Sequence, residues 1–402
     1  MSAQVIPEVG VNTREIAPDR TFPGQTSGAV PHPRIFTAEA FLVTLCVCFV
    51  LMGLLLIYCS SSVYSSQHYG NQYYFLFRQL GFAFSGFLLL AFFACRDYQD
   101  LRDKAGLLLI LSLVLMLILW IPGLGKTVKG ARRWLQLGPV NFQPSELVKL
   151  SLVVFLSYFL SRRWGKRTTG GFADYCRIWI LCLPFLGLVL ATRDFGTTVI
   201  LGLAVMMLLC LAGAKPAHLL YTIAAGIPVG IYFCMQPFRL QRILSFRDPW
   251  KDAYGSGYQL VQSLLALGRG GWLGVGPGNG SEKLFYLPDG HTDFIFAVLG
   301  EEFGLAGCCV LLALFLLFVV TGVRVALRAP DQFGMLLASG ITFLVGFQVI
   351  LNVSVVMGLL PTKGMVLPFL SYGGSALWVN LMAVGILVSV ARQGVYRSGP
   401  RG

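Results

Sequence analysis

The stretch S-E-K-L-F-Y-L-P-D-G-H-T-D-F-I-F-A-V-L-G-E-E, residues 281–302, joins a polar loop to a long apolar helix. It holds five of the chain's 18 acidic residues. An ionised carboxylate beside the hydrocarbon core of a bilayer is energetically costly unless it faces other protein or water. Carboxylates in such a place are therefore candidates for function, and Asp293 is the first among them.

The composition of the whole chain places this stretch in a membrane. Of its 402 residues, 56% are hydrophobic and only 12% are charged, and the mean hydropathy is +0.71. Runs of about 18 or more apolar residues predict membrane-spanning helices, since about 20 residues cross the hydrocarbon core. We predict an all-α polytopic membrane protein with about ten transmembrane helices. The predicted spans are 38–59, 76–95, 105–122, 146–160, 177–191, 195–212, 217–235, 293–322, 333–357 and 374–391.

The segments outside the spans define the predicted organisation. Residues 1–35 are rich in proline and predict a disordered cytoplasmic tail without a cleavable signal peptide. Residues 36–393 form the membrane domain, and 394–402 form a short second cytoplasmic tail. The basic connection S-R-R-W-G-K-R (161–167) places both termini in the cytoplasm. The large loop 236–292, between helices 7 and 8, is then extracytoplasmic, and it is too short and glycine-rich for a globular domain.

Basic residues are frequent in the predicted outer loops. Segment 126–134 contains four Lys and Arg residues, and loop 236–292 contains six. Such clusters suit an anionic ligand such as phosphate or pyrophosphate. Binding of anionic lipid head groups stays open as an alternative. We expect membrane lipids, but no nucleic acid, among the partners.

The cysteine and histidine residues do not indicate a metal site or disulfide bonds. Most of the ten Cys lie in or beside apolar spans, where Cys is a small buried residue. The four His are widely separated and show no zinc-ligand spacing. We therefore expect no protein-bound structural metal.

The loop sequence G-R-G-G-W-L-G-V-G-P-G-N-G, residues 268–280, contains seven glycines. It lacks the strand and helix context of phosphate-binding motifs. We predict that the glycines allow the backbone to pack tightly over the helix bundle, with conformational freedom of the loop as the alternative. The preceding segment predicts a short amphipathic helix. Its Gln259, Gln262 and Ser263 are candidates for hydrogen bonds to a sugar, although a solvated helix face is equally open.

Residues of the helix that follows the loop are separated by about 100° around the helix axis, which shows which side chains share a face. Asp293, Ala297, Gly300, Gly304 and Gly307 then fall on one line. Small residues at this spacing mark a face where membrane helices approach closely. Asp293 is thus predicted to point into the bundle or a cavity. The alternative is a first-turn carboxylate that only complements the helix dipole.

Three titratable residues accompany Asp293. His291 lies two positions before it and is a candidate substrate contact. Glu301 and Glu302 lie deeper and point in other directions. A structural salt bridge and a water-lined path are both open for these two glutamates.

The segment K-G-A-R-R-W-L-Q-L-G-P-V-N-F-Q-P-S-E-L-V-K-L, residues 129–150, is a second cluster of polar residues. Its end has the pattern of a helix start, with Gln143 before a proline and Glu146 three positions later. Lys149 lies one turn inside an apolar helix, where an ammonium group needs an anion or a path to the interface. The candidate ligands for a lipid-linked pyrophosphate are six residues of this segment: Arg132, Arg133, Trp134, Gln143, Glu146 and Lys149.

Two further segments complete the candidate site. The sequence L-L-P-T-K-G-M-V-L-P-F-L-S-Y-G-G-S, residues 359–375, is too apolar for a solvated loop and too rich in Pro and Gly for a helix. It predicts a re-entrant segment that lines a site, with Lys363 and Ser371 as its polar contacts. In R-D-F-G-T-T, Asp194 lies at a turn between two spans and is interpreted as a helix cap.

These stretches, in this order, resemble the SEDS family of bacterial polytopic membrane proteins. The resemblance covers residues 38–393, and the motifs H-T-D-F-I-F-A-V-L-G-E-E-F-G and L-P-T-K-G-M-V-L-P-F-L-S-Y-G-G-S carry it. It favours the cell-division branch of the family over the elongation branch. Two departures are Arg193, where many relatives have proline, and Asn141, where some have arginine.

The resemblance implies a peptidoglycan glycosyltransferase that polymerises lipid II on the outer face of the bacterial cytoplasmic membrane. It implies a class B penicillin-binding protein as partner, with other membrane proteins of the division septum. The family's catalytic aspartate corresponds to Asp293, and its polar motif corresponds to Gln143, Glu146 and Lys149.

The chemistry expected of these residues is an inverting sugar transfer. Asp293 would act as general base on the acceptor 4-hydroxyl, and basic side chains would stabilise the departing pyrophosphate. A divalent cation, Mg or Mn, on the pyrophosphate is a further expectation. The competing hypotheses are a lipid II flippase and a non-catalytic scaffold that recruits the penicillin-binding protein.

Overall fold

The protein is described from a computed structural model of the whole chain. The structure describes residues 37–128, 130–138, 140–163, 171–280 and 290–397. The predicted tail at 1–35 lies outside these residues, as does the end of the second tail at 398–402.

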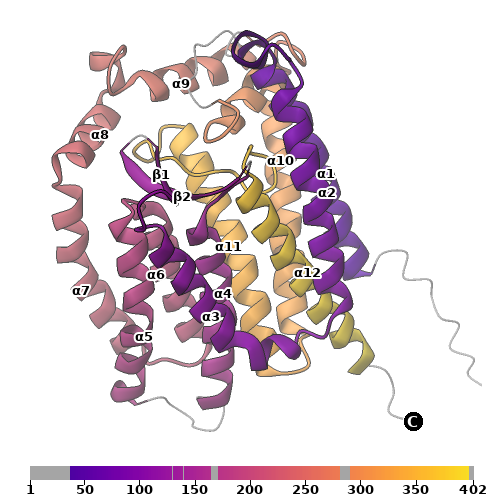
Figure 1. The fold of residues 1–402 in the computed structure, drawn as a ribbon, viewed down its shortest axis with the longest axis vertical. Helices are drawn as coiled ribbons and strands as arrows, with labels where there is room; N and C mark the ends of the chain where they lie inside the picture. Colours follow the sequence, from indigo (N-terminus) through magenta and orange to yellow (C-terminus); the bar gives the residue numbers. More distant parts are fainter. Residues whose placement is uncertain (1–36, 129, 139, 164–170, 281–289, 398–402) are drawn as a thin grey trace, which may run out of the picture. The chain divides into compact units, whose positions relative to one another are not determined.

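Long helices form most of the described chain and overlap all ten predicted spans (Figure 1). These helices are α1 (Ala38–Tyr69), α2 (Tyr74–Cys95), α3 (Asp100–Ile118), α4 (Pro144–Arg163), α5 (Phe172–Ala191), α6 (Phe195–Leu211), α7 (Pro216–Cys234), α10 (Ile295–Leu327), α11 (Gln332–Val356) and α12 (Gly374–Arg397). The prediction of a helical polytopic membrane protein is confirmed.

Eight of the described helices are long and apolar enough to cross a membrane. Of the other two that overlap predicted spans, α6 has only 17 residues, and α3 starts with several charged side chains, including Asp100, Arg102 and Asp103. These charges leave α3 a short apolar part. The number of membrane crossings and the cytoplasmic location of both termini stay predictions.

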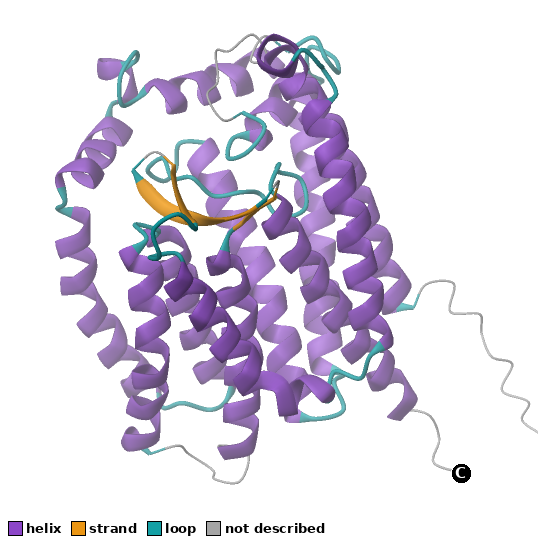
Figure 2. Cartoon of the chain, in the orientation of Figure 1, coloured by secondary structure: helices purple, strands orange, loops and turns teal. Residues whose placement is uncertain are grey.

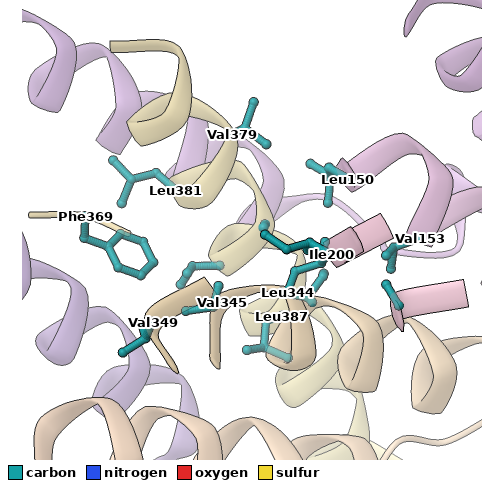
Figure 3. Packing of buried hydrophobic residues seen from close by; sticks show 14 of the residues in the cluster. Leu150, Val153, Ile200, Leu344, Val345, Val349, Phe369, Val379, Leu381 and Leu387 are labelled. Atoms are coloured by element: carbon teal, nitrogen blue, oxygen red, sulfur yellow. The ribbon is translucent and has the colours of Figure 1, made fainter. Parts of the chain in front are cut away.

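The core of the bundle lies around α11, which packs against α4, α6, α10 and α12. Apolar side chains from these helices interdigitate, among them Val153 of α4, Ile200 of α6 and Val345 of α11 (Figure 3). In lipid, close packing of this kind stabilises helix association because lipid tails are themselves apolar. Helix α11 is therefore the element against which the site is positioned.

A small antiparallel sheet was missed by the all-α prediction. Its strands are β1 (Gly125–Val128), β2 (Ala131–Leu137) and β3 (Val140–Phe142), in the order β1-β2-β3 (Figure 2). The strands are short and basic, so the segment looks like a polar loop in sequence. Gly130, with φ of 74°, supplies the left-handed backbone of the first turn.

The large loop contains two helices and a 3-10 turn. These are α8 (Pro237–Arg247), η1 (Pro249–Asp252) and α9 (Tyr258–Gly270). The predicted amphipathic helix is confirmed as α9. The hydroxyl of Ser263 is buried and donates to the carbonyl of Val356 at 2.7 Å, which ties α9 to the end of α11. Ser263 therefore serves packing, not a solvent-facing hydrogen bond.

Helix α10 is broken at Gly304, which has φ of 66° and ψ of −165°. The glycine-rich loop fills the break. A Cβ atom on Gly304 would lie 2.4 Å from the nitrogen of Gly274, and one on Gly270 would lie 1.8 Å from the carbonyl of Gly300. Only glycine permits this approach, so the prediction of tight backbone packing is confirmed.

The helical line drawn through Asp293 needs correction. Helix α10 begins at Ile295 with Phe294 as N-cap, so Asp293 lies in the preceding turn. The break at Gly304 also interrupts the line further along. The inward position of Asp293 therefore comes from the turn and its neighbours, not from helical periodicity.

The segment predicted to be re-entrant has irregular backbone from residue 357 to 373. Polar side chains satisfy it: Asn352 donates to the carbonyl of Met365 at 2.6 Å, and Gln348 donates to that of Val366 at 2.9 Å. Irregular backbone within a membrane protein requires such internal partners. The predicted irregular, cavity-lining backbone is confirmed, and its re-entrant course in the membrane stays a prediction.

Candidate functional site

A cavity of about 1190 Å³ opens among the sheet, the irregular segment 357–373 and several helices. Many residues predicted from the sequence line it. These are Gln143, Glu146, Lys149, Arg133, Trp134, Asp194, Gln259, Asp293 and Lys363. Segments that are far apart in the sequence thus meet at one site.

Asp293 is held in the cavity wall through its backbone. The amide of Asn352 donates to the Asp293 carbonyl at 2.9 Å, so α11 fixes this turn. The carboxylate lies against the backbone of Gly364: a Cβ atom there would be 2.9 Å from Asp293 Oδ2. The Asp293 turn is thus positioned by α11 on one side and by the irregular segment on the other.

Arg242 of α8 brings a cation to the same place. Burial and the positive charge of Arg133 lower the pKa of Arg242, and the negative charge of Asp293 opposes that shift. These influences show that Arg133, Arg242 and Asp293 share one electrostatic neighbourhood. In the sequence, Arg242 is only one of six basic residues in the large loop 236–292.

Lys149, which lies within an apolar helix, forms an ion pair with Glu146. Its Nζ lies 2.8 Å from Glu146 Oε2 and donates to Gln348 Oε1 at 2.8 Å. Both charged side chains are almost fully buried. A buried pair of this kind depends on each partner, because one charge alone would be uncompensated. Gln143, directly before α4, donates its side-chain amide to Ser145 Oγ at 3.0 Å.

Arg133 of β2 is hydrogen-bonded to the turn before α6. Its guanidinium donates to the carbonyls of Thr192 at 3.3 Å and Arg193 at 2.6 Å. Arg193 has φ of 64°, an unusual conformation for a residue with a side chain. Asp194 accepts from the Thr197 amide at 3.2 Å, so its prediction as a helix cap is confirmed.

Lys363 reaches across the cavity to the start of α6. Its Nζ lies 5.3 Å from the centroid of the Phe195 ring, a cation–π contact. A Cβ atom on Gly196 would lie 2.0 Å from Lys363 Cε, so the absence of a side chain at 196 makes room for the lysine. The cavity therefore gains an ammonium group from the irregular segment.

Arg132 does not line the cavity, in contrast to the prediction of a pyrophosphate contact. Its guanidinium donates to the carbonyls of Trp120 and Ile121 at 3.3 and 3.1 Å. Consecutive side chains of a strand point to opposite sides, so Arg132 and Arg133 cannot both enter the cavity. Arg132 instead ties β2 to the turn that follows α3.

Three other predicted contacts lie outside the cavity lining. The His291 ring packs among aromatic rings, 4.9 Å from Phe75 and 5.8 Å from Tyr372. The hydroxyl of Ser371 accepts from the Leu367 amide at 2.8 Å and is buried within the irregular segment. Gln262 is half-buried on α9, whereas Gln259 on the same helix lines the cavity.

Glu301 and Glu302 are buried beside the break in α10, away from the cavity lining. Glu301 Oε1 lies 3.9 Å from the guanidinium of Arg269 on α9. This ion pair supports the structural alternative for Glu301.

The cavity lining carries an excess of positive charge. The described lining contains seven basic and three acidic side chains. The basic ones are Arg78, Lys126, Arg133, Lys149, Arg193, Arg242 and Lys363, and the acidic ones are Glu146, Asp194 and Asp293. Such a site attracts an anion, and arginine suits phosphate in particular.

Four basic residues of this lining were not predicted as site residues: Arg78, Lys126, Arg193 and Arg242. Arg78 lies within the predicted span 76–95, so only Lys126, Arg193 and Arg242 were signalled by the excess of basic residues in the outer loops. That excess could not indicate which of the basic side chains turn inward.

Residues 39–396 match the family model FtsW/RodA/SpoVE, described as cell cycle protein. The chain belongs to this family. The predicted membership of the SEDS family is therefore confirmed.

Curated relatives of this FtsW/RodA/SpoVE chain cover most of its length. It is 41% identical over 356 residues to a Geobacter sulfurreducens protein named "Probable peptidoglycan glycosyltransferase FtsW", covering 88% of this chain and 95% of that protein. It is 38% identical over 361 residues to stage V sporulation protein E of Bacillus subtilis, covering 89% and 98%. The names of the FtsW relatives agree with the predicted cell-division branch.

Solved structures of family members share the fold. One belongs to a study titled "Structural coordination of polymerization and crosslinking by a peptidoglycan synthase complex", with a TM-score of 0.73 and 30% identity, covering 88% of this chain and 97% of that one. Another is the rod shape determining protein RodA of Thermus thermophilus, with a TM-score of 0.64 and 29% identity, covering 88% and 96%. This FtsW/RodA/SpoVE chain is thus a multi-pass membrane protein of known fold.

Proposed function

We propose that this chain is a peptidoglycan glycosyltransferase that polymerises lipid II into β1→4 glycan strands during septal wall synthesis. The observation that carries the proposal is the position of Asp293 among basic side chains in a cavity of about 1190 Å³. The relatives named peptidoglycan glycosyltransferase FtsW support the same activity. The substrate is an anionic lipid-linked sugar, which fits the excess of positive charge.

The reaction assigns one role to Asp293. Its carboxylate accepts the proton of the acceptor 4-hydroxyl while that oxygen attacks the anomeric carbon of the donor. The bond from this carbon to the lipid pyrophosphate breaks at the same time, and the configuration inverts. A general base of this kind contributes about 10² to 10⁴ in rate.

The basic side chains stabilise the charge that develops on the pyrophosphate. Arg133 and Arg242 lie in the electrostatic neighbourhood of Asp293. Lys363 enters from the irregular segment, and Lys149 contributes through its pair with Glu146. Donors fixed before the reaction act most strongly, because they need not reorganise as charge builds up.

A divalent cation fits the donors of this cavity when the substrate is bound. The described residues contain no group of three or more His, Cys, Asp or Glu that would hold a metal alone. Magnesium, however, commonly binds through one or two carboxylates together with substrate phosphates. Carboxylates of the cavity lining would hold the cation together with the pyrophosphate, and Mg or Mn would neutralise leaving-group charge. Chelation with EDTA should lower the rate of polymerisation and Mg²⁺ should restore it; an unchanged rate contradicts the cation.

The partner is proposed to be a class B penicillin-binding protein, together with other proteins of the division machinery and membrane lipids. A structural neighbour from a peptidoglycan synthase complex that couples polymerization and crosslinking supports this assembly. The proposed location is the bacterial cytoplasmic membrane at the septum.

The decisive experiment measures glycan synthesis by the purified chain with its cognate penicillin-binding protein. Labelled lipid II is supplied with an inhibitor of transpeptidation. Asp293→Asn should abolish polymer, whereas Asp103→Asn, an exposed carboxylate at the start of α3, should not change it. A folded wild-type complex that makes no polymer would refute the proposal.

The same preparation separates the two competing functions. A flippase moves lipid II across liposome membranes, and that transport survives Asp293→Asn. A scaffold recruits the penicillin-binding protein but yields no polymer and no transport.

A further inference from the structure

The distribution of charged residues along α10 indicates that its break lies at one boundary of the membrane. Residues 305–323 are 19 consecutive uncharged residues, and Arg324 follows them. At about 1.5 Å per residue they span roughly 28 Å, close to the thickness of the hydrocarbon core. Gly304 therefore lies where α10 leaves the hydrocarbon, on the side that holds the cavity.

The glycine-rich loop is joined to α10 at this boundary by backbone hydrogen bonds. The amides of Val275 and Gly276 donate to the carbonyls of Glu301 and Glu302 at 3.0 and 3.1 Å. On the other side of the break, the amides of Leu305 and Ala306 donate to the carbonyls of residues 271 and 272 at 2.9 and 3.0 Å. Backbone that is satisfied in this way can enter a bilayer without leaving polar groups unpaired.

Large apolar side chains project from the loop at the same level. Trp272 is 78% exposed and Leu273 is 82% exposed, and Leu305 beside them on α10 is 48% exposed. The loop residues 270–280 include no charged side chain. The apolar surface continues along α10 through exposed residues such as Val310, which face lipid in a transmembrane helix.

We propose that residues 271–275 form a membrane anchor that inserts into the leaflet on the cavity side. The Trp272 ring lies at the level of the lipid head groups, where tryptophan is preferred, and Leu273 reaches the first part of the acyl chains. The partner is lipid, because the anchor continues the lipid-facing surface of α10 and carries no charge.

The anchor holds the cavity wall at a fixed height above the bilayer. Helix α9 leads directly into it and places Gln259 in the lining. The same helix is tied to α11 by the bond from Ser263 to Val356. A shift of the loop out of the membrane would therefore pull on α9 and on the wall that it forms.

The first experiment measures the depth of Trp272 in proteoliposomes. The emission of Trp272 is obtained as the difference between wild type and Trp272→Phe. We expect lipids brominated near the head group to quench this emission more than lipids brominated deep in the chains, and aqueous acrylamide to quench it weakly. Free quenching by acrylamide without quenching by brominated lipid overturns the proposal. Emission that neither agent quenches indicates cover by protein and also overturns it.

A second experiment tests the anchor without fluorescence. In Leu273→Asp, the buried charge should expel the loop and increase the rate of trypsin cleavage after Arg269 several-fold in proteoliposomes. Leu273→Met keeps the apolar volume and should be cleaved like wild type. Tyr254→Asp changes a residue that is 97% exposed outside this loop and serves as the charge control. Equal cleavage of Leu273→Asp and Leu273→Met contradicts the insertion, whether or not the chain polymerises lipid II.

Discussion

Replacing Gly364 by alanine should slow glycan synthesis without unfolding the protein. The added Cβ atom would lie 2.9 Å from Asp293 Oδ2, about 0.5 Å inside the 3.4 Å at which ordinary contact begins. The carboxylate is the end of a side chain and moves aside at little cost in stability. A displacement of about 1 Å at a reacting group can cost about 100-fold in rate, so about 0.5 Å should cost roughly tenfold.

The assay is the rate of polymerisation of labelled lipid II by the purified complex, with the melting temperature measured in parallel. The matched control is Gly373→Ala in the same segment, whose added Cβ would meet only side chains at 3.8 Å. We expect kcat to fall in Gly364→Ala alone, while both variants melt close to wild type. Equal rates for the two variants, or an equal loss in both, would refute the reasoning that Gly364 sets the position of Asp293.

Three further predictions concern residues of the cavity and of the break in α10. Lys149→Met leaves the buried Glu146 without its cation and should destabilise the protein by about 3–5 kcal/mol. The double variant Lys149→Met with Glu146→Gln should recover much of the lost melting temperature. No recovery would argue against the ion pair between Lys149 and Glu146. Gly304→Ala places a side chain at φ of 66° and against the inserted loop, so it should lower the melting temperature far more than Gly226→Ala, which meets nothing within 4 Å. Arg242→Gln removes a cation near Asp293 and should raise KM for lipid II by about tenfold, in line with the loss of one charged hydrogen bond; an unchanged KM with lower kcat would assign Arg242 to the chemical step.

The helices could be predicted from the sequence because long apolar runs have few alternatives in a membrane. The irregular segment was also predictable, since prolines and glycines within an apolar stretch exclude a regular helix. Lys363 reaches the cavity as its sequence pattern indicated, whereas Asp194, predicted only as a helix cap, also lines the cavity.

The sheet and the inward basic residues could not be predicted in the same way. Strand β2 has only seven residues, and its basic side chains resemble those of a solvated loop. The opposite directions of Arg132 and Arg133 appear only once the strand is known. The helix break at Gly304 could not be predicted from the sequence, because glycine is also common where membrane helices contact each other.

Helix α11 sets the distance between the Lys149 side and the Asp293 side of the cavity. Gln348 binds Lys149 and the carbonyl of Val366, and Asn352 binds the Asp293 turn and the carbonyl of Met365. The two amides are four residues apart, about 6 Å along one rigid helix. A tilt or slide of α11 would carry the ammonium group and the carboxylate together. The spacing between Lys149, the proposed charge stabiliser, and Asp293, the proposed base, is therefore expected to be preserved when α11 shifts.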